Sequence, residues 1–285
     1  MGDGCQGMGG VMIEALQFEF MRHALLAGLL ASIACGIIGT LVVVNRIVFI
    51  SGGIAHAAYG GVGLAFFLGF PPLLGAAGFS LVVSSIMAMV TLSNKQRADT
   101  IVGVLWAVGM ALGIILTDLS TGYNVDLMSY LFGSILAVPR SDLVAMAAVD
   151  LLVVAVVGLF YNSFLAMSFD EEFAVATGVP VKPLYFALLA MTAFVVVMVI
   201  RVVGLILVIA LFTIPPYIAE RYSGSLRAMM LFSGVLSSLF TVIGLWLSYL
   251  FNLTSGATII LVAAFFFFVS LLIDRLRKQR NLPLP

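Results

Sequence analysis

The chain contains a series of apolar runs, each close to the length of about 20 residues that an α-helix needs to cross a bilayer. Only 9% of its 285 residues are charged and 63% are hydrophobic. An average soluble domain carries about 25% charged residues, so this chain is too poor in charge to cover a globular surface in water. We predict an integral membrane protein with nine spans, at residues 20–44, 47–68, 71–93, 99–117, 141–164, 182–200, 202–218, 228–250 and 255–273.

Lipid offers no hydrogen-bond partners, so a spanning segment has to satisfy its backbone internally. We therefore predict an all-α, polytopic helical bundle of about eight to nine spans, with a re-entrant or short helix and a short cytoplasmic helix. The number stays open because only Arg201 and Gly204 interrupt the run 182–218, whose second half could be short or re-entrant. The Pro215-Pro216 pair is expected to kink or end that helix, because proline donates no backbone hydrogen bond.

The segment between the fourth and fifth predicted spans, residues 118–140, is more than a plain loop. It begins with polar residues and continues with the apolar run Leu127–Val138, which is too short to cross a bilayer. We predict a re-entrant or interfacial helix with Asn124 or Asp126 as its N-cap. Irregular backbone at membrane depth is tolerated only where it is buried in protein or lines a water-filled path.

The domain organisation is expected to be simple. The first residues are rich in glycine and lack the basic start of a signal peptide, so no cleavable signal is expected and Met12 is an alternative start. No long loop is available to form a soluble catalytic domain. We divide the chain into an N-terminal extension at 1–19, a transmembrane domain at 20–278 and a C-terminal tail at 279–285.

Basic residues predict how the chain lies across the membrane, because cytoplasmic loops carry an excess of Lys and Arg. With nine spans and a cytoplasmic C-terminus, ten of the 13 basic residues fall inside. Three fall outside, namely Arg22, Arg140 and Arg201. The same threading puts the N-terminus outside and the segment 168–180 in the cytoplasm.

Residues 168–180 form an acidic amphipathic stretch between two apolar runs. Asp170, Glu171 and Glu172 follow one another in a chain that is otherwise almost free of charge. Bare carboxylates are too costly inside lipid, so this segment must face water. The pattern indicates a surface that contacts a soluble partner, and a membrane protein that the partner drives.

His56 lies in the second predicted span, where Gly52, Gly60 and Gly63 share its helix face. We expect these glycines to leave open space beside the imidazole. Neutral imidazole is a ligand for zinc, manganese or iron, and an ionisable group inside a membrane is a functional candidate by default. The alternative, a histidine that is hydrogen-bonded to a neighbouring helix, is equally open.

Two acids are further candidate metal ligands. Asp150 lies about 13 Å along the fifth span from Ser141, at about 1.5 Å per residue. It is either a ligand in a path or an acid that is protonated or paired within the bundle, and the sequence supplies no partner for it. Asp126 is either a helix cap or an acid at the mouth of a path.

Small residues at helical spacing predict close contacts between helices. Gly109 and Gly113 form one such pair, and Gly36 and Thr40 form another. Pairs of this kind let two backbones approach each other in a membrane, so we interpret both as packing features.

Five blocks along the chain carry a family resemblance. The most specific is VDLMSYLFGSIL at 125–136, with the pattern DL…LFG…L. The others are the histidine-bearing span at 48–68, ADTIVG at 98–103, the acidic segment at 169–181, and a VG-x-L…IP segment at 202–215. In this order they resemble the metal-ion permease family of ABC transporters, the membrane subunits for zinc, manganese or iron uptake, from about residue 12 to 278.

The resemblance implies a permease homodimer in a bacterial or archaeal cytoplasmic membrane, surrounded by lipid, with a metal path at the dimer axis. Two cytoplasmic ABC ATPases would bind the ATP, and an extracytoplasmic metal-binding protein would deliver the ion. The permease itself would hold no tightly bound cofactor. The acidic segment would be the coupling helix that the ATPase pushes, with these contact residues: Phe169, Asp170, Glu171, Glu172, Phe173 and Gly178.

The chain departs from the family pattern at three positions. Gly52 and Ser134 stand where many members carry an aspartate, and Ala107 is near the place of a second histidine in some. Either Asp150 or the two-fold copy of His56 completes the site, or the ion is bound weakly and with much water. Weak binding is compatible with transport, because the ion must also leave.

Other functions remain open from the sequence. A permease for a metal chelate such as a siderophore would share the fold. A passive channel would leave the acidic segment unexplained. An intramembrane enzyme would use His56 and Asp150 as acid and base, but no nucleophile motif or paired metal-ligand motif accompanies them, so no catalytic residue is assigned. Net charge is zero, which gives no indication of a nucleic-acid partner.

Overall fold

A computed structural model describes residues 17–93, 98–120 and 138–280. All regular elements in these ranges are α-helices, which confirms the predicted all-α class. The helices are α2 (Glu19–Val44), α3 (Val48–Leu68), α4 (Pro72–Ser93), α5 (Ala98–Leu119), α7 (Arg140–Leu159), α8 (Tyr161–Phe169), α9 (Glu171–Ala176), α10 (Val181–Val203), α11 (Leu205–Tyr222), α12 (Leu226–Phe251) and α13 (Ser255–Arg280).

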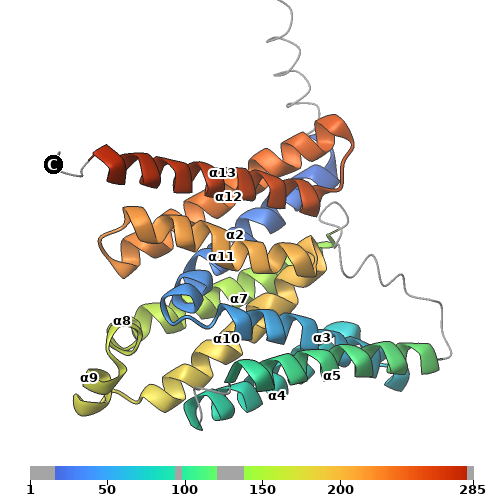
Figure 1. Cartoon of the computed structure of the whole chain (residues 1–285). Helices are drawn as coiled ribbons and strands as arrows, with labels where there is room; N and C mark the ends of the chain where they lie inside the picture. Colours follow the sequence, from blue (N-terminus) through green and yellow to red (C-terminus); the bar gives the residue numbers. More distant parts are fainter. Residues whose placement is uncertain (1–16, 94–97, 121–137, 281–285) are drawn as a thin grey trace, which may run out of the picture.

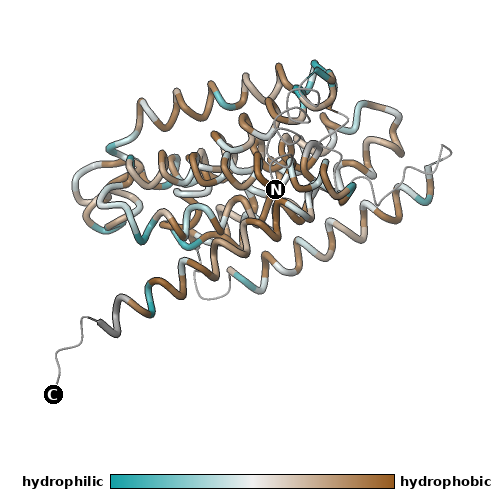
Figure 2. The backbone as a smooth tube through the Cα atoms, turned by 90° about the horizontal axis from the view of Figure 1, so that it is seen from above, coloured by the Kyte–Doolittle hydropathy of each residue, from teal (hydrophilic) through white to brown (hydrophobic). Residues whose placement is uncertain are grey.

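Within the described ranges, nine helices are long and apolar enough to cross a membrane. They fall on the nine predicted spans, and the run 182–218 is divided at Gly204 into α10 and α11. Figure 2 shows apolar residues along the helices and hydrophilic residues mostly near their ends. The protein is therefore a multi-pass membrane protein. The predicted re-entrant helix lies largely at 121–137, outside the described residues.

The fifth span is shorter than predicted. The sequence suggested a helix over 141–164, but α7 ends at Leu159, and Phe160 takes a non-helical conformation with ψ 20° before α8 begins. The apolar run continues across this break, so hydropathy alone could not place it. Because α8 and α9 follow the break, the turn at Phe160 delivers the acidic segment to the membrane surface.

The Pro215-Pro216 pair does not end α11, which continues to Tyr222. Two prolines remove two backbone donors from the helix, so local propensity alone would favour a stop. Packing supplies the support instead. A Cβ placed on Gly39 of α2 would lie 3.0 Å from the Phe212 carbonyl oxygen and 3.1 Å from Pro216 Cγ. α2 thus lies directly against this part of α11.

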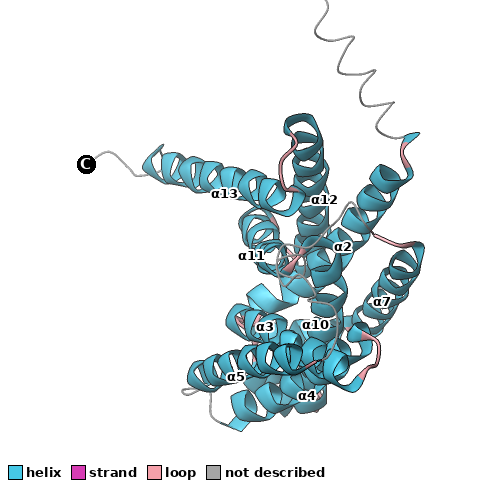
Figure 3. Ribbon diagram, turned by 90° about the vertical axis from the view of Figure 1, so that its right-hand side faces the viewer, coloured by secondary structure: helices cyan, strands magenta, loops and turns pink. Residues whose placement is uncertain are grey.

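The spans form two groups joined by central helices. Figure 3 shows α3, α4 and α5 on one side and α11, α12 and α13 on the other. α2 packs on α7, α11 and α12, while α10 packs on α4, α2 and α3. α2, α3 and α10 are the most buried spans, and α5, α7 and α13 the most exposed. The largest hydrophobic core therefore surrounds α2 and α10.

The positions of the helix ends agree with the predicted order in which the chain crosses the membrane. Figure 1 places α8, α9, the α11–α12 connection and the C-terminal end of α13 at one end of the bundle, on the left, and the α12–α13 connection at the other. The left end carries the acidic segment, Arg221 and Arg227. By the excess of positive charge we assign it to the cytoplasm.

Glycines bring α3 and α5 into backbone contact. A Cβ on Gly60 would lie 2.8 Å from the Gly109 carbonyl oxygen, and one on Gly63 would collide with the backbone of Gly113. The packing role predicted for Gly109 and Gly113 is confirmed. The expectation that Gly60 and Gly63 leave open space beside His56 is wrong, because α5 occupies that space.

Candidate functional site

His56 is half-buried on α3, about 12 Å from the cytoplasmic end of that helix at about 1.5 Å per residue. Its Nδ1 lies 2.9 Å from the carbonyl oxygen of Gly52. A carbonyl oxygen only accepts hydrogen bonds, so Nδ1 carries the proton and Nε2 keeps its lone pair. A hydrogen bond of this kind fixes the tautomer of metal-binding histidines. Nε2 is thus the nitrogen that can bind a metal ion.

The His56 ring stacks on Trp106 of α5. The ring centroids are 3.8 Å apart and the planes differ by 29°. Trp106 is held in turn, since its Nε1 donates to Met110 Sδ at 3.3 Å, and Phe49 lies 6.1 Å from it. Sequence reasoning missed Trp106, because no spacing rule relates a residue of α3 to one of α5.

The other predicted ligands do not join His56 in the described part of the chain. No group of three or more His, Cys, Asp or Glu side chains able to hold a metal occurs there. Asp150 lies on α7, which packs chiefly on α2 and α10, whereas α3 packs chiefly on α5 and α4. Asp150 is 7% exposed and its Oδ2 has no hydrogen-bond partner among these residues. Asp126 lies outside the described residues.

The acidic segment forms a short helix that is capped at both ends. We call residues 168–180 the acidic elbow. Asp170 is the N-cap of α9, and its Oδ1 accepts a hydrogen bond from the Phe173 amide at 2.9 Å. After α9, Gly178 has φ 82°, and the Val179 amide donates to the Ala174 carbonyl at 2.9 Å. Six residues cannot hold a helix alone, so these caps fix its shape.

The outer face of the acidic elbow is apolar and exposed. Phe169 is 70% exposed, Phe173 60% and Val175 60%. Glu172 is exposed beside them. In the threading above these side chains face the cytoplasm, not lipid. Large apolar side chains that are exposed to water mark a candidate interaction site, and the exposed Glu172 carboxylate lies in the same segment.

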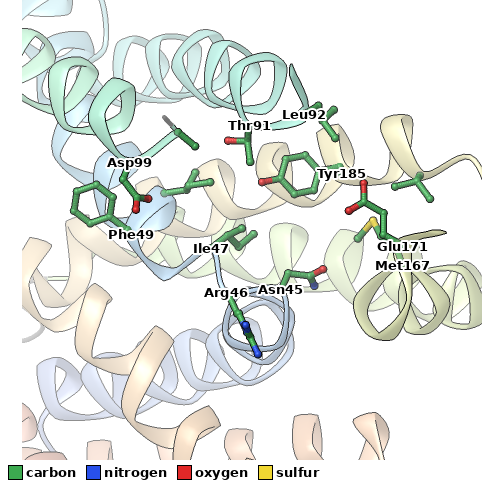
Figure 4. Close-up of a pocket in the computed structure, with 13 residues that line it drawn as sticks. Asn45, Arg46, Ile47, Phe49, Thr91, Leu92, Asp99, Met167, Glu171 and Tyr185 are labelled. Carbon is green, nitrogen blue, oxygen red and sulfur yellow. The ribbon is translucent and has the colours of Figure 1, made fainter. Parts of the chain in front are cut away.

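The inner face of the acidic elbow lines a cavity of about 520 Å³ whose walls are partly polar and partly apolar. Figure 4 shows Glu171 and Tyr185 pointing into it, together with Thr91 and Asp99 from the ends of α4 and α5. The hydroxyl groups of Tyr185 and Thr91 are both buried and face each other at this cavity. Glu171 therefore faces the transmembrane helices, whereas Glu172 faces away.

A hydrogen bond ties the acidic elbow to the end of α2. Asn45 Nδ2 donates to Ser168 Oγ at 2.9 Å and to the Leu41 carbonyl at 2.7 Å. Asn45 also lines the 520 Å³ cavity. The elbow is thus joined to the α2–α3 connection, which leads to the helix that carries His56. Sequence reasoning missed this link, because 123 residues separate the two side chains.

Nine spanning helices in the described ranges, with a short capped helix at one end of the bundle, define a polytopic membrane protein. A comparison with protein-family models matches residues 17–274 to the ABC 3 transport family. The chain belongs to this family of ABC transporter permeases, which confirms the resemblance found in the sequence. It is a transport subunit and not an enzyme, because ATP hydrolysis in such systems is carried out by a separate component.

The chain is similar to relatives over nearly its whole length. An uncharacterised membrane protein of Synechocystis sp. is 52% identical over 264 residues, which is 93% of this chain and 94% of that protein. The manganese transport system membrane protein MntC of Listeria monocytogenes is 33% identical over 257 residues, 90% of this chain and 91% of that one. The solved structure of PsaBC from Streptococcus pneumoniae in complex with Fab has a TM-score of 0.83 at 32% identity, covering 92% and 94%.

Proposed function

We propose that the chain forms the membrane path of an ATP-driven importer for a divalent transition metal ion, namely zinc, manganese or iron. Membership of the permease family and the likeness to a relative named as a manganese transport protein support this cargo. Two copies would enclose a path at the dimer axis in a bacterial or archaeal cytoplasmic membrane. A cytoplasmic ABC ATPase pair would drive the cycle, and an extracytoplasmic binding protein would deliver the ion.

The observation that carries this proposal is the exposed apolar face of the acidic elbow. Phe173 projects from the capped helix α9, and Phe169 projects from the end of α8 directly before it. Burying two aromatic side chains supplies several kcal/mol, at about 25 cal/mol per Å² of apolar surface. Such a surface fits a groove on an ATPase, and Glu172 would meet a basic residue at its rim.

The inner contacts of the acidic elbow suggest how ATPase movement reaches the path. The Asn45–Ser168 hydrogen bond joins the elbow to the end of α2, and Glu171 lines one cavity together with the ends of α4 and α5. α5 carries Trp106, on which His56 stacks. Displacement of the elbow would shift these helix ends and change the space around His56. Close-packed cores have low compressibility, so a cavity is where a change in the spacing of these helix ends meets least resistance.

His56 is the proposed metal ligand on α3, acting through Nε2. One imidazole is a weak site for a divalent ion, and its two-fold copy in the homodimer would double the nitrogen ligands. Asp126 and Asp150 stay proposed ligands of the same path. The buried carboxylate of Asp150 lacks a hydrogen-bond partner among the described residues, so a cation or a proton would compensate its charge.

The proposal is tested in proteoliposomes that contain the chain, its ATPase and its binding protein. We expect uptake of radioactive manganese, zinc or iron only when all three are present and ATP is on the ATPase side. Liposomes with the chain alone are the control. Transport by the chain alone down a metal gradient would contradict the importer and indicate a channel.

His56→Gln is expected to reduce metal uptake about tenfold or more, the scale on which the loss of even an outer contact to a metal acts. Glutamine keeps a polar side chain of similar size and is a good helix former, so the helix should fold as before. Its oxygen is a poorer ligand than imidazole for these ions. Uptake in the proteoliposomes gives the answer, and ATPase co-purification is the matched measure of intact assembly. Full uptake by His56→Gln would exclude His56 as a ligand.

A further inference from the structure

A second hollow lies on the lipid-facing side of the bundle, between α2, α7 and α12. It has a volume of about 340 Å³, and its walls are apolar apart from its cytoplasmic end. The wall residues Val154 and Leu231 are 47% and 73% exposed. Gly158 forms part of the wall, and a Cβ there would meet no atom within 4 Å. The protein therefore leaves this groove open.

The cytoplasmic end of the groove carries a cation. Arg227, in the first turn of α12, has its guanidinium carbon 4.3 Å from the ring centroid of Tyr161 at the start of α8. Arg227 pairs with no acid in the described residues, whereas Arg140 pairs with Glu19 and Arg221 with Asp274. The guanidinium lies over the Tyr161 ring, and because Arg227 is exposed its N–H groups remain available to a ligand.

Depth in the membrane identifies the kind of occupant. Ile37 lines the groove and lies about 12 Å from Asn45, the cytoplasmic end of α2, at about 1.5 Å per residue. The groove thus extends into the hydrocarbon region, where a soluble protein cannot reach. A phospholipid combines an acyl chain for the apolar wall with a phosphate for Arg227. The anionic lipids of the cytoplasmic leaflet also complement the positive charge.

We propose that this groove binds an anionic phospholipid of the cytoplasmic leaflet, with its phosphate on Arg227 and an acyl chain along α7 and α12. The lipid would connect the start of α12 to the α7–α8 turn at Phe160, from which the acidic elbow extends. The inference does not depend on the nature of the transported ion.

The test compares lipid retention by the purified full-length chain in native mass spectrometry. Phosphatidylglycerol and phosphatidylcholine with the same acyl chains are offered together. We expect the wild type to retain phosphatidylglycerol preferentially. Arg227→Gln should lower that preference about fivefold, the effect of about one charge at a membrane surface. An unchanged preference in Arg227→Gln would overturn the proposal.

Gly158→Phe tests the groove separately from the charge. The phenyl ring would enter the open space and exclude an acyl chain, so both lipids should be lost, whereas Gly158→Ala should keep them. Thermal unfolding of each variant in detergent confirms that the chain is folded. Retention of both lipids by a folded Gly158→Phe variant would overturn the proposal. So would a cysteine cross-link at Leu231 between two copies, because the occupant would then be a second chain.

Discussion

Phe173→Asp is expected to abolish stable binding of the ATPase and, with it, ATP-dependent metal uptake. Phe173 is 60% exposed on α9, whose caps hold it in place, and Asp170 is one of those caps. Central aromatic anchors contribute about 2 kcal/mol or more to an interface. An aspartate would in addition place a charge in an apolar groove. We expect a loss of affinity of about 30-fold or more, measured by co-purification of the ATPase with the tagged permease.

The matched control is Phe251→Asp at the opposite end of the bundle. Phe251 is the last residue of α12 and is 66% exposed, so the change in side chain and exposure is the same. It lies on the outer side in our threading, away from any cytoplasmic ATPase. Normal co-purification of Phe173→Asp, or equal loss in both variants, would contradict docking through the acidic elbow.

The two neighbouring acids of the elbow should behave differently. Glu172 is exposed on the outer face, whereas Glu171 is half-buried and lines the cavity with Tyr185. The sequence assigned both to the ATPase contact, because a run of charges carries no information on which side faces the membrane helices. The structure divides their proposed roles between the partner surface for Glu172 and the connection to α4, α5 and α10 for Glu171.

Hydropathy predicted the membrane helices well because a segment that crosses lipid must satisfy its backbone hydrogen bonds internally, which favours a helix. The charge of the connecting segments was enough to suggest an orientation. Two expectations were wrong: the end of the fifth span, and the alternative in which Pro215 and Pro216 end their helix. Both depend on tertiary contacts: α7 stops where the chain turns toward the elbow, and α11 continues because α2 lies against Phe212 and Pro216.

The candidate site was predictable only in part. His56 was found because an ionisable residue in an apolar run is conspicuous. The surroundings of His56 could not be predicted. The Trp106 stack and the Asn45–Ser168 hydrogen bond each join two different helices, and no local sequence pattern shows how two helices are aligned. The glycines beside His56 were interpreted as space for a ligand, yet they allow α5 to approach α3. A glycine in a helix indicates that another group comes close to the backbone, but not whether that group is a ligand or a neighbouring helix.

That close approach leads to the largest expected effect on stability. Gly113→Ala should destabilise the protein by about 3 kcal/mol, the upper part of the range for overpacking. Its Cβ would lie 2.5 Å from the Tyr59 carbonyl oxygen and 2.7 Å from the carbonyl carbon. Backbone atoms cannot avoid the new methyl group by changing rotamer as a side chain can, so α5 would have to move away from α3. We expect a lower unfolding temperature of the purified chain in detergent and, because Trp106 moves with α5, reduced metal uptake.

Gly103→Ala is the control on the same helix. A Cβ on Gly103 would meet no atom within 4 Å. Replacing glycine with alanine in a helix stabilises it by about 0.5–1 kcal/mol where nothing collides. The two variants add the same methyl group to α5, so membrane insertion and helix propensity change alike and only the contact with α3 differs. Equal unfolding temperatures for Gly113→Ala and Gly103→Ala would show that the α3–α5 contact does not hold His56 and Trp106 together.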